Sequence, residues 1–183
     1  MELAIHWAGG TQQFENIKRV NEAFPDKNLI FTEGFIGKFE LNKINDWNNG
    51  DHYGQSMIND FNNGVVGWTD WNILLDEKRG PNHVQNFCFA PVHYKTKTDK
   101  LIYNSEYYYI GHFSKYIKPG ARRISFASSK SFLLTTAFRN LTGKIVVVVM
   151  NQDNKTVKFL IWMDGKSIES SMPGRSNSTF MIE

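Results

Sequence analysis

Three short apolar runs in the first 72 residues each end in side chains that can take part in chemistry. They lead into His6-Trp7, into Glu33 and into Asp70-Trp71-Asn72. A carboxylate such as Glu33 can attack the anomeric carbon of a sugar, as the nucleophile of a two-carboxylate glycosidase does. An imidazole can hydrogen-bond the hydroxyls of that sugar, and a neighbouring indole can stack on its ring. A carbohydrate site is therefore the first hypothesis for this sequence.

Each of these residues also has a plain structural interpretation. Glu33 is compatible with a surface position or a helix cap, and His6 with a core histidine whose nitrogens bond the backbone. Loop residues of the Asx type bond their own backbone and so favour turns. The residues with this second interpretation are Asp70, Asn72, Asn82 and Asn86. The residues alone leave both interpretations open.

The sequence lacks the residues that other classes of reaction need. The five histidines show no zinc-ligand spacing, and the single cysteine, Cys88, excludes an intrachain disulfide. Cys88 is expected to be a small buried apolar residue. The sequence has no phosphate-binding glycine loop and no nucleophile elbow. We therefore expect no metal and no cofactor.

Strands and amphipathic helices alternate in the first part of the chain. Strands are expected over 3–5, 28–33 and 65–68, and helices over 14–24 and 53–61. This alternation is typical of βα units in a parallel sheet or barrel. Barrel enzymes carry their site residues at the C-terminal ends of strands, where His6, Glu33 and Asp70 lie. A doubly wound sheet would give a similar pattern.

The pattern changes after one further expected helix over 105–117. Strands are then expected over 132–138, 145–150, 157–163, 168–172 and 178–182. The first two flank a Leu-Thr-Gly turn, which predicts an antiparallel hairpin. The chain is therefore expected to comprise two domains, residues 1–118 with βα units and residues 119–183 built from strands.

Composition and charge narrow the class of protein and of partner. The 183 residues are 41% hydrophobic and 21% charged, which is ordinary for a globular chain, and 14% are aromatic. The basic residues around 115–123 are expected to be a solvated helix end rather than a nucleic-acid surface. No stretch approaches the roughly 18 apolar residues of a membrane span. The start has no signal-peptide pattern, so a cytoplasmic location is expected if the chain is complete.

Taken together, these segments resemble glycoside hydrolase family 30, specifically its glucosylceramidase-like branch. The matching stretches follow the family's order and spacing: AIHW at 4–7, FPDKNLIFTEGFIG at 24–37, GVVGWTDWN at 64–72, GPNHVQNFC at 80–88, YYYIGHFSKYIKPGARRI at 107–124 and IVVVVMN at 145–151. The resemblance implies a partial (β/α)8 TIM barrel, its last three βα units, followed by an antiparallel β-sandwich. It implies a β-glucoside substrate, glucosylceramide first and β-1,6-glucan as the alternative.

The resemblance also implies a role for individual residues. Glu33, in the motif TEG, matches the nucleophile that forms the covalent glycosyl-enzyme. His6 and Trp7 match residues that line the glucose subsite. Trp71 matches the aromatic residue that borders the sugar, and Asn86 matches an asparagine near its hydroxyls.

The sequence departs from the family pattern in three ways. Ala8 stands where the family usually has a tyrosine, which should alter the hydrogen bonding of the nucleophile. Arg79 stands where the family's loop often has glycine, which is expected to change the local backbone without touching the chemistry. The Asn-Glu-Pro segment that carries the acid/base glutamate is absent. The chain is therefore expected to be a C-terminal portion of a family member, a poor hydrolase alone, to which a separate chain would supply the N-terminal barrel half. A non-catalytic remnant that binds carbohydrate or a partner chain is the alternative, and a split gene, a truncated gene and a gene-model fragment all remain open.

Overall fold

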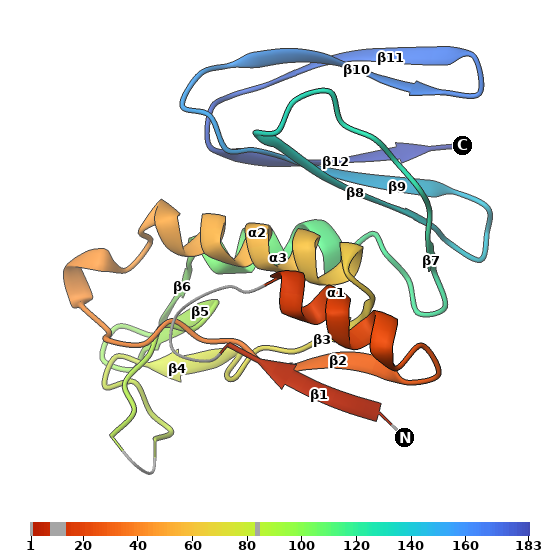
Figure 1. The fold of residues 1–183 in the computed structure, drawn as a ribbon. Coiled ribbons are helices and arrows are strands. Elements are labelled where there is room, and N and C mark those ends of the chain that lie inside the picture. The colour runs from red at the N-terminus through yellow and green to blue at the C-terminus, as the bar shows by residue number, and fades with distance from the viewer. Residues whose placement is uncertain (1, 8–13, 83–84) are drawn as a thin grey trace. The chain divides into compact units, whose positions relative to one another are not determined.

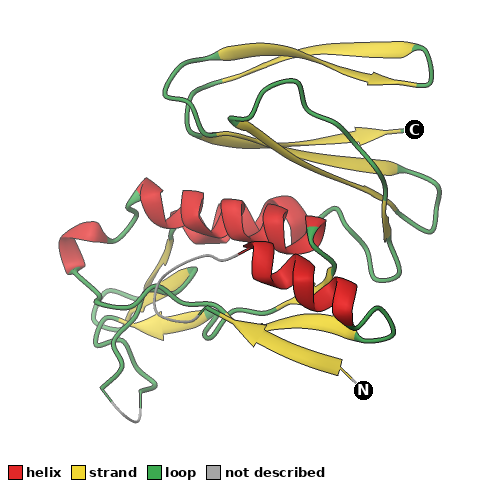
Figure 2. Ribbon diagram, viewed as in Figure 1, coloured by secondary structure: helices red, strands yellow, loops and turns green. Residues whose placement is uncertain are grey.

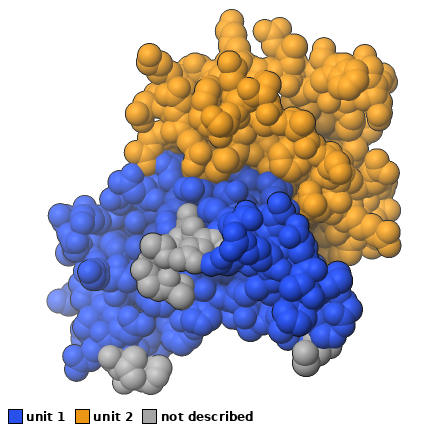
Figure 3. All heavy atoms as spheres, viewed as in Figure 1, with its two compact units in different colours: residues 1–110 blue, residues 111–183 orange. Residues whose placement is uncertain are grey.

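The computed structural model describes residues 2–7, 14–82 and 85–183. The chain divides into two compact units, Met1–Ile110 and Gly111–Glu183 (Figure 3). The division falls within helix α3 (Ser105–Ser114). Each unit has its own sheets.

Unit 1 is built around a three-stranded parallel sheet in the order β1-β2-β3. The strands are β1 (Glu2–His6), β2 (Asn28–Glu33) and β3 (Val65–Trp68), and helices α1 (Phe14–Ala23) and α2 (Trp47–Asn62) follow the first two. Both helices lie against one face of the sheet (Figure 1). The strands and helices expected from periodicity in this part are confirmed, although α2 begins at Trp47, six residues earlier than expected.

An apolar core joins the sheet to its helices. Leu29, Phe31 and Val65 are buried, and they pack with side chains from α1 and α2. These partners are Ile17, Val20 and Phe61. Ile17 and Val20 recur at helical spacing, so α1 packs one partly buried apolar face on the sheet while its other face can remain polar. The apolar residues that predicted the helices are therefore the ones that pack against the sheet.

Helix α2 has a defined start and end. The side chain of Asp46 caps it by accepting a hydrogen bond from the Asn48 amide at 3.0 Å. The helix is followed by Asn63 and by Gly64, whose φ of +104° is readily adopted by glycine. The helix therefore ends at Asn62.

Several short elements of the first unit were not expected from the sequence. These are β4 (Leu74–Asp76), β5 (Val92–Lys95), β6 (Lys100–Tyr103) and a single 3-10 turn, η1 (Leu41–Lys43). Strand β5 pairs in parallel with β4 and antiparallel with β6. Runs of three or four residues are too short to show a period, so only their pairing identifies them as strands.

Unit 2 consists of two antiparallel sheets. One has four strands in the order β12-β9-β8-β7, and the other is the hairpin β10-β11. The strands are β7 (Arg122–Arg123), β8 (Leu133–Arg139), β9 (Ile145–Asn151), β10 (Val157–Met163), β11 (Lys166–Met172) and β12 (Ser176–Ile182). From Lys115 onward every regular element is a strand (Figure 2). The expected change from βα units to strands is confirmed, although α3 ends at Ser114, three residues earlier than expected.

Candidate active site

The backbone around Glu33 is held from both sides. Glu33 ends the central strand of the parallel sheet, and it pairs with His6 of β1 at a register shift. On the other side, the Thr69 amide donates to the Phe31 carbonyl and the Trp71 amide to the Gly34 carbonyl, both at 2.9 Å. These contacts fix the half-buried Glu33 between the end of β1 and the segment that follows β3.

Aromatic rings gather around Phe31, two residues before Glu33. Trp7 contacts Phe31, His52 and Tyr53, with ring centroids 5.6, 4.4 and 5.3 Å away. Trp68 stacks on Phe31 at 4.7 Å with the planes only 6° apart. Edge and offset contacts of this kind add stability beyond the apolar area that they bury.

Gly34, which follows Glu33, allows this packing. A Cβ at this position would lie 2.8 Å from Cη2 of Trp68, closer than such atoms approach. Any larger residue would push the indole away from Phe31. The glycine of the motif TEG is therefore required by packing rather than by a special backbone conformation.

A chain of hydrogen bonds orients the two indoles. Nε1 of Trp7 donates to Oγ of Ser56 at 3.0 Å, and Ser56 donates to Oδ2 of Asp60 at 2.7 Å. Nε1 of Trp68 donates to the same oxygen at 3.0 Å. Burial raises the pKa of Asp60 to about 6, while the bonds from Ser56 and Trp68 act in the opposite direction. Ser56 and Asp60 were not predicted as part of the site; the available signal was two polar residues one turn apart on the buried face of a helix.

Asp70 forms a second buried connection. Its Oδ1 accepts the hydroxyl of Tyr53 at 2.8 Å and the amide of Trp71 at 3.0 Å. Its Oδ2 is buried and has no hydrogen-bond partner in the described part of the chain. Burial raises the pKa of Asp70 to about 7, and the Tyr53 and Trp71 bonds partly offset that rise. Burial and the neighbouring Asp70 raise the pKa of Tyr53 well above its usual value.

The remaining residues expected at the site lie on the surface. His6 is exposed, so it is not the core histidine that the sequence also allowed. The Trp71 side chain is 45% exposed. Asn86 is exposed, and its carbonyl accepts Nδ2 of Asn82 at 2.7 Å, so both residues take part in loop hydrogen bonding. Ala8 lies outside the described residues.

Arg79 adopts a conformation that favours glycine. Its φ is +65°, in the left-handed region. The guanidinium lies 4.2 Å from the ring centroid of Phe39 and 5.4 Å from that of Phe87. The expected backbone effect of replacing glycine here is therefore strain, and cation–π contacts oppose it.

The described residues contain neither a cluster of metal ligands nor a helix that could span a membrane. No group of three or more potential metal ligands occurs among them. No helix in this part of the chain combines the length and the apolar character needed to cross a bilayer. Cys88 is 1% exposed, and burial raises its pKa to about 11, as expected of a structural thiol.

Two family models match consecutive parts of the chain. The glycosyl hydrolase family 30 TIM-barrel domain matches residues 1–117, and the β-sandwich domain of the same family matches residues 120–180. The chain belongs to glycosyl hydrolase family 30. The first match covers only part of a barrel, so the expected partial TIM barrel followed by a β-sandwich is confirmed.

A mouse protein and two solved structures are each similar to nearly the whole chain. Lysosomal acid glucosylceramidase of Mus musculus is 32% identical over 98% of this chain and 36% of its own length. The solved structure of SrfJ from Salmonella typhimurium is 35% identical, with a TM-score of 0.92, over 98% of this chain and 40% of that one. The endo-β1,6-glucanase BT3312 is 29% identical, with a TM-score of 0.86, over 97% and 40%. The chain thus spans well under half the length of these relatives.

Proposed function

We propose that the chain is the C-terminal part of a retaining β-glycosidase of family 30 in which Glu33 is the nucleophile. The observation that carries this proposal is the position of Glu33. It ends the central strand of a parallel sheet. Its backbone is held on one side by pairing with β1 and on the other by hydrogen bonds from the segment after β3 to neighbouring residues. The C-terminal ends of such strands are where barrel enzymes carry their chemistry.

The chemistry requires a second carboxyl group. Glu33 attacks the anomeric carbon, the bond to the leaving oxygen breaks, and an acid about 5 Å from the nucleophile protonates that oxygen. The same group then activates the water that hydrolyses the glycosyl-enzyme. The sequence holds no Asn-Glu-Pro segment, so we assign this acid to polypeptide outside residues 1–183. Without this acid, the rate of hydrolysis would fall by about 10²–10⁴-fold.

Four residues are proposed to bind the sugar. Trp7 is held by four aromatic neighbours and by Ser56, so its indole would meet the sugar ring without first being ordered. The exposed Trp71 is free to stack on a pyranose, and its backbone is bonded beside Glu33. His6 and Asn86 supply polar groups for the hydroxyls. The proposed reaction needs only carboxyl groups and water.

Glucosylceramide is the proposed substrate class, supported by the similarity to the mouse glucosylceramidase. The similarity to an endo-β1,6-glucanase supports β-1,6-glucan as the second candidate. The two are separated by comparing hydrolysis of glucosylceramide in mixed micelles with hydrolysis of β-1,6-linked glucose oligomers. Activity on the oligomers alone would favour the second candidate.

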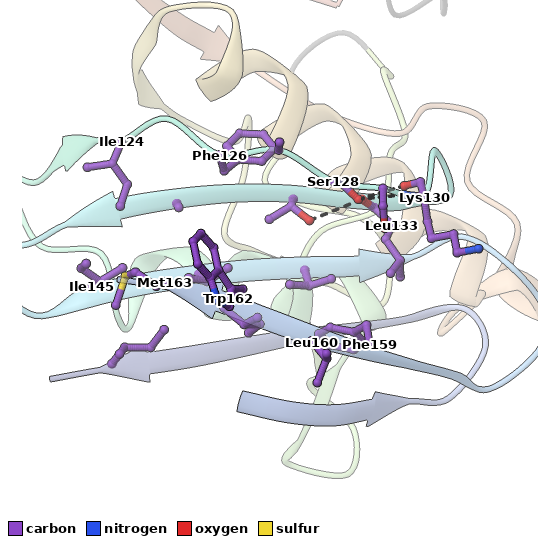
Figure 4. A pocket seen from close by; sticks show the side chains of 18 of the residues that line it. Ile124, Phe126, Ser128, Lys130, Leu133, Ile145, Phe159, Leu160, Trp162 and Met163 are labelled. Carbon is purple, nitrogen blue, oxygen red and sulfur yellow. Dashed lines mark hydrogen bonds between the residues drawn. The ribbon is translucent and has the colours of Figure 1, made fainter. Parts of the chain in front are cut away.

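Open apolar surfaces in both units support the proposal that further polypeptide, such as a chain carrying the N-terminal barrel half, completes the protein. In unit 1, Ile73 is 77% exposed and Val66 is 62% exposed. In unit 2, a cavity of about 490 Å³ lies between β8, β9 and the residues of β10 (Figure 4). Strand β10 pairs only with β11 among the described residues, so its other edge is free to accept a strand.

The test is covalent labelling with a cyclophellitol-type β-glucoside probe, followed by intact mass and peptide mapping. We expect one label on Glu33 and none in the Glu33→Gln variant. Labelling elsewhere, or equal labelling of the variant, would contradict the assignment. No labelling of a folded chain, alone or mixed with the N-terminal part of a relative, would favour the non-catalytic alternative.

A further inference from the structure

We propose that Asp70 is a positioning residue for the reaction at Glu33. By accepting from Tyr53 and from the Trp71 amide, it would fix the segment that binds the backbone next to the nucleophile. This inference rests on the proposed role of Glu33. It adds Asp70, which has no part in the proposed function.

One amide connects Asp70 to the nucleophile. The Trp71 amide lies 3.0 Å from Oδ1 of Asp70 and 2.9 Å from the carbonyl of Gly34. Its hydrogen is therefore shared between the carboxyl group and the residue that follows Glu33. Asp70 and the Gly34 carbonyl accept the same hydrogen, so the charge of Asp70 affects how the Trp71 amide, and with it the backbone beside Glu33, is positioned.

Tyr53 fixes the carboxyl group in turn. Its hydroxyl donates to the same oxygen at 2.8 Å, and its side chain is only 1% exposed. The rings of Trp7 and Trp68 lie 5.3 and 5.5 Å from its own ring. Asp70 is thus attached to the part of α2 that also orients the aromatic wall of the site.

The strength of this connection depends on the charge of Asp70. The titratable groups that face it are Tyr53 on α2, Glu106 on α3 and the thiol of Cys88, and it forms no ion pair with a described residue. Burial and Glu106 raise its pKa, to about 7, while the Tyr53 bond lowers it. An ionised carboxylate accepts hydrogen bonds more strongly than a neutral acid, so the segment is held more firmly above that pH.

The test is the ratio of the Glu33 labelling rates of the wild type and of Asp70→Asn, measured from pH 5.5 to 8.5. Taking the ratio cancels the titration of the probe and of other groups. We expect the ratio to rise roughly tenfold through neutral pH, the effect of one weakened charge-assisted bond. Tyr53→Phe should move the midpoint of the rise to higher pH, and Glu106→Gln should move it to lower pH.

The chain offers a matched control in the exposed pair Tyr94 and Asp99. The Tyr94 hydroxyl donates to Asp99 at 2.7 Å, in the turn region of the β5-β6 hairpin. The variants Asp99→Asn and Tyr94→Phe make the same chemical changes away from Glu33 and should leave the labelling rate unchanged at every pH. A ratio for Asp70→Asn that stays flat would overturn the positioning role.

A second measurement is independent of labelling. In folded wild type and Asp70→Asn, we compare hydrogen exchange of the Trp71 amide with that of the Thr69 amide, which is bonded to the Phe31 carbonyl instead. Selective acceleration at Trp71, roughly tenfold, is expected. Equal exchange at Trp71 in both proteins would overturn the proposal even if the wild type does not label, whereas a failure to label alone would count against the role of Glu33.

Discussion

At the scale of single residues, three carboxyl groups of unit 1 have raised pKa values: Asp60 and Glu106, which are buried, and Asp70, which is half-buried. Burial raises the pKa values of Asp60 to about 6 and of Asp70 and Glu106 to about 7. Each carboxyl holds its proton more tightly in the folded protein than in the unfolded chain. The stability linked to each is therefore fully present below the unfolded pKa and is lost as pH rises through the folded pKa.

Asp60→Asn should remove one such dependence while retaining an acceptor for Ser56 and Trp68. We expect the wild type to lose stability relative to the variant between about pH 4 and pH 7. The shift from 3.8 to about 6 corresponds to about 3 kcal/mol. Urea unfolding at a series of pH values, followed by tryptophan fluorescence, measures the difference. A difference that does not change with pH would contradict the raised pKa.

Arg79 should show two opposing effects on stability. Arg79→Ala loses the contact with Phe39 and keeps the left-handed backbone, whereas Arg79→Gly loses the contact but relieves the strain. We expect the glycine variant to be more stable than the alanine variant by about 1 kcal/mol. Thermal unfolding of the two variants is the measurement. The opposite order would rule out the positive φ.

At the scale of elements, the contact between α2 and α3 depends on Gly50. A Cβ at this position would lie 2.6 Å from the ring of Tyr109 and 2.9 Å from Cβ of Ser105. The Gly50 amide also donates to Oγ of Ser105 at 3.0 Å. The first turns of the two helices therefore approach closely because this residue has no side chain.

Gly50→Ala should destabilise the protein despite its better helix propensity. The propensity gain is about 1 kcal/mol, and overpacking costs about 1–3 kcal/mol, so we expect a net loss. Gly111→Ala in α3 is the control, because a Cβ there would meet nothing within 4 Å and only the gain should remain. Denaturant unfolding compares the two. Equal effects would indicate that α2 and α3 do not pack closely at Gly50.

At the scale of the whole molecule, open apolar surface is the main feature. Residues 1–118 and 119–183 remain our proposed domains, and we propose that further polypeptide covers their open surfaces. In unit 2, Trp162 on β10 is 73% exposed and lines the cavity (Figure 4). Surfaces of this kind favour self-association until a partner covers them.

Trp162→Lys should weaken self-association of the chain several-fold. It replaces an exposed indole with a charge beside the free edge of β10. Ser167→Lys is the matched control, because Ser167 is directly opposite Trp162 in the hairpin register and its replacement removes no apolar side chain. Sedimentation velocity over a concentration series gives the result. An equal effect of both variants would mean that charge alone, and not the indole, governs association.

The sequence by itself determined the regular elements and the place of Glu33 within them. The apolar pattern of 28–33 and the helical spacing of 14–24 each depend on which faces of one element are buried, and neighbouring residues record that directly. The motifs around Glu33 also identified the family. Short strands such as β4 were not predicted, because three residues are too few to show an alternating apolar pattern.

Only the tertiary structure decided which side chains meet. Tyr53 bonds Asp70 across 17 residues, and Trp7 bonds Ser56 across 49. Such pairs depend on how the helices pack on the sheet and on its register, which no local pattern encodes. The positive φ of Arg79 likewise follows from the loop around it rather than from its residue type. Local burial patterns thus set the elements, and long-range packing set the contacts around the proposed nucleophile.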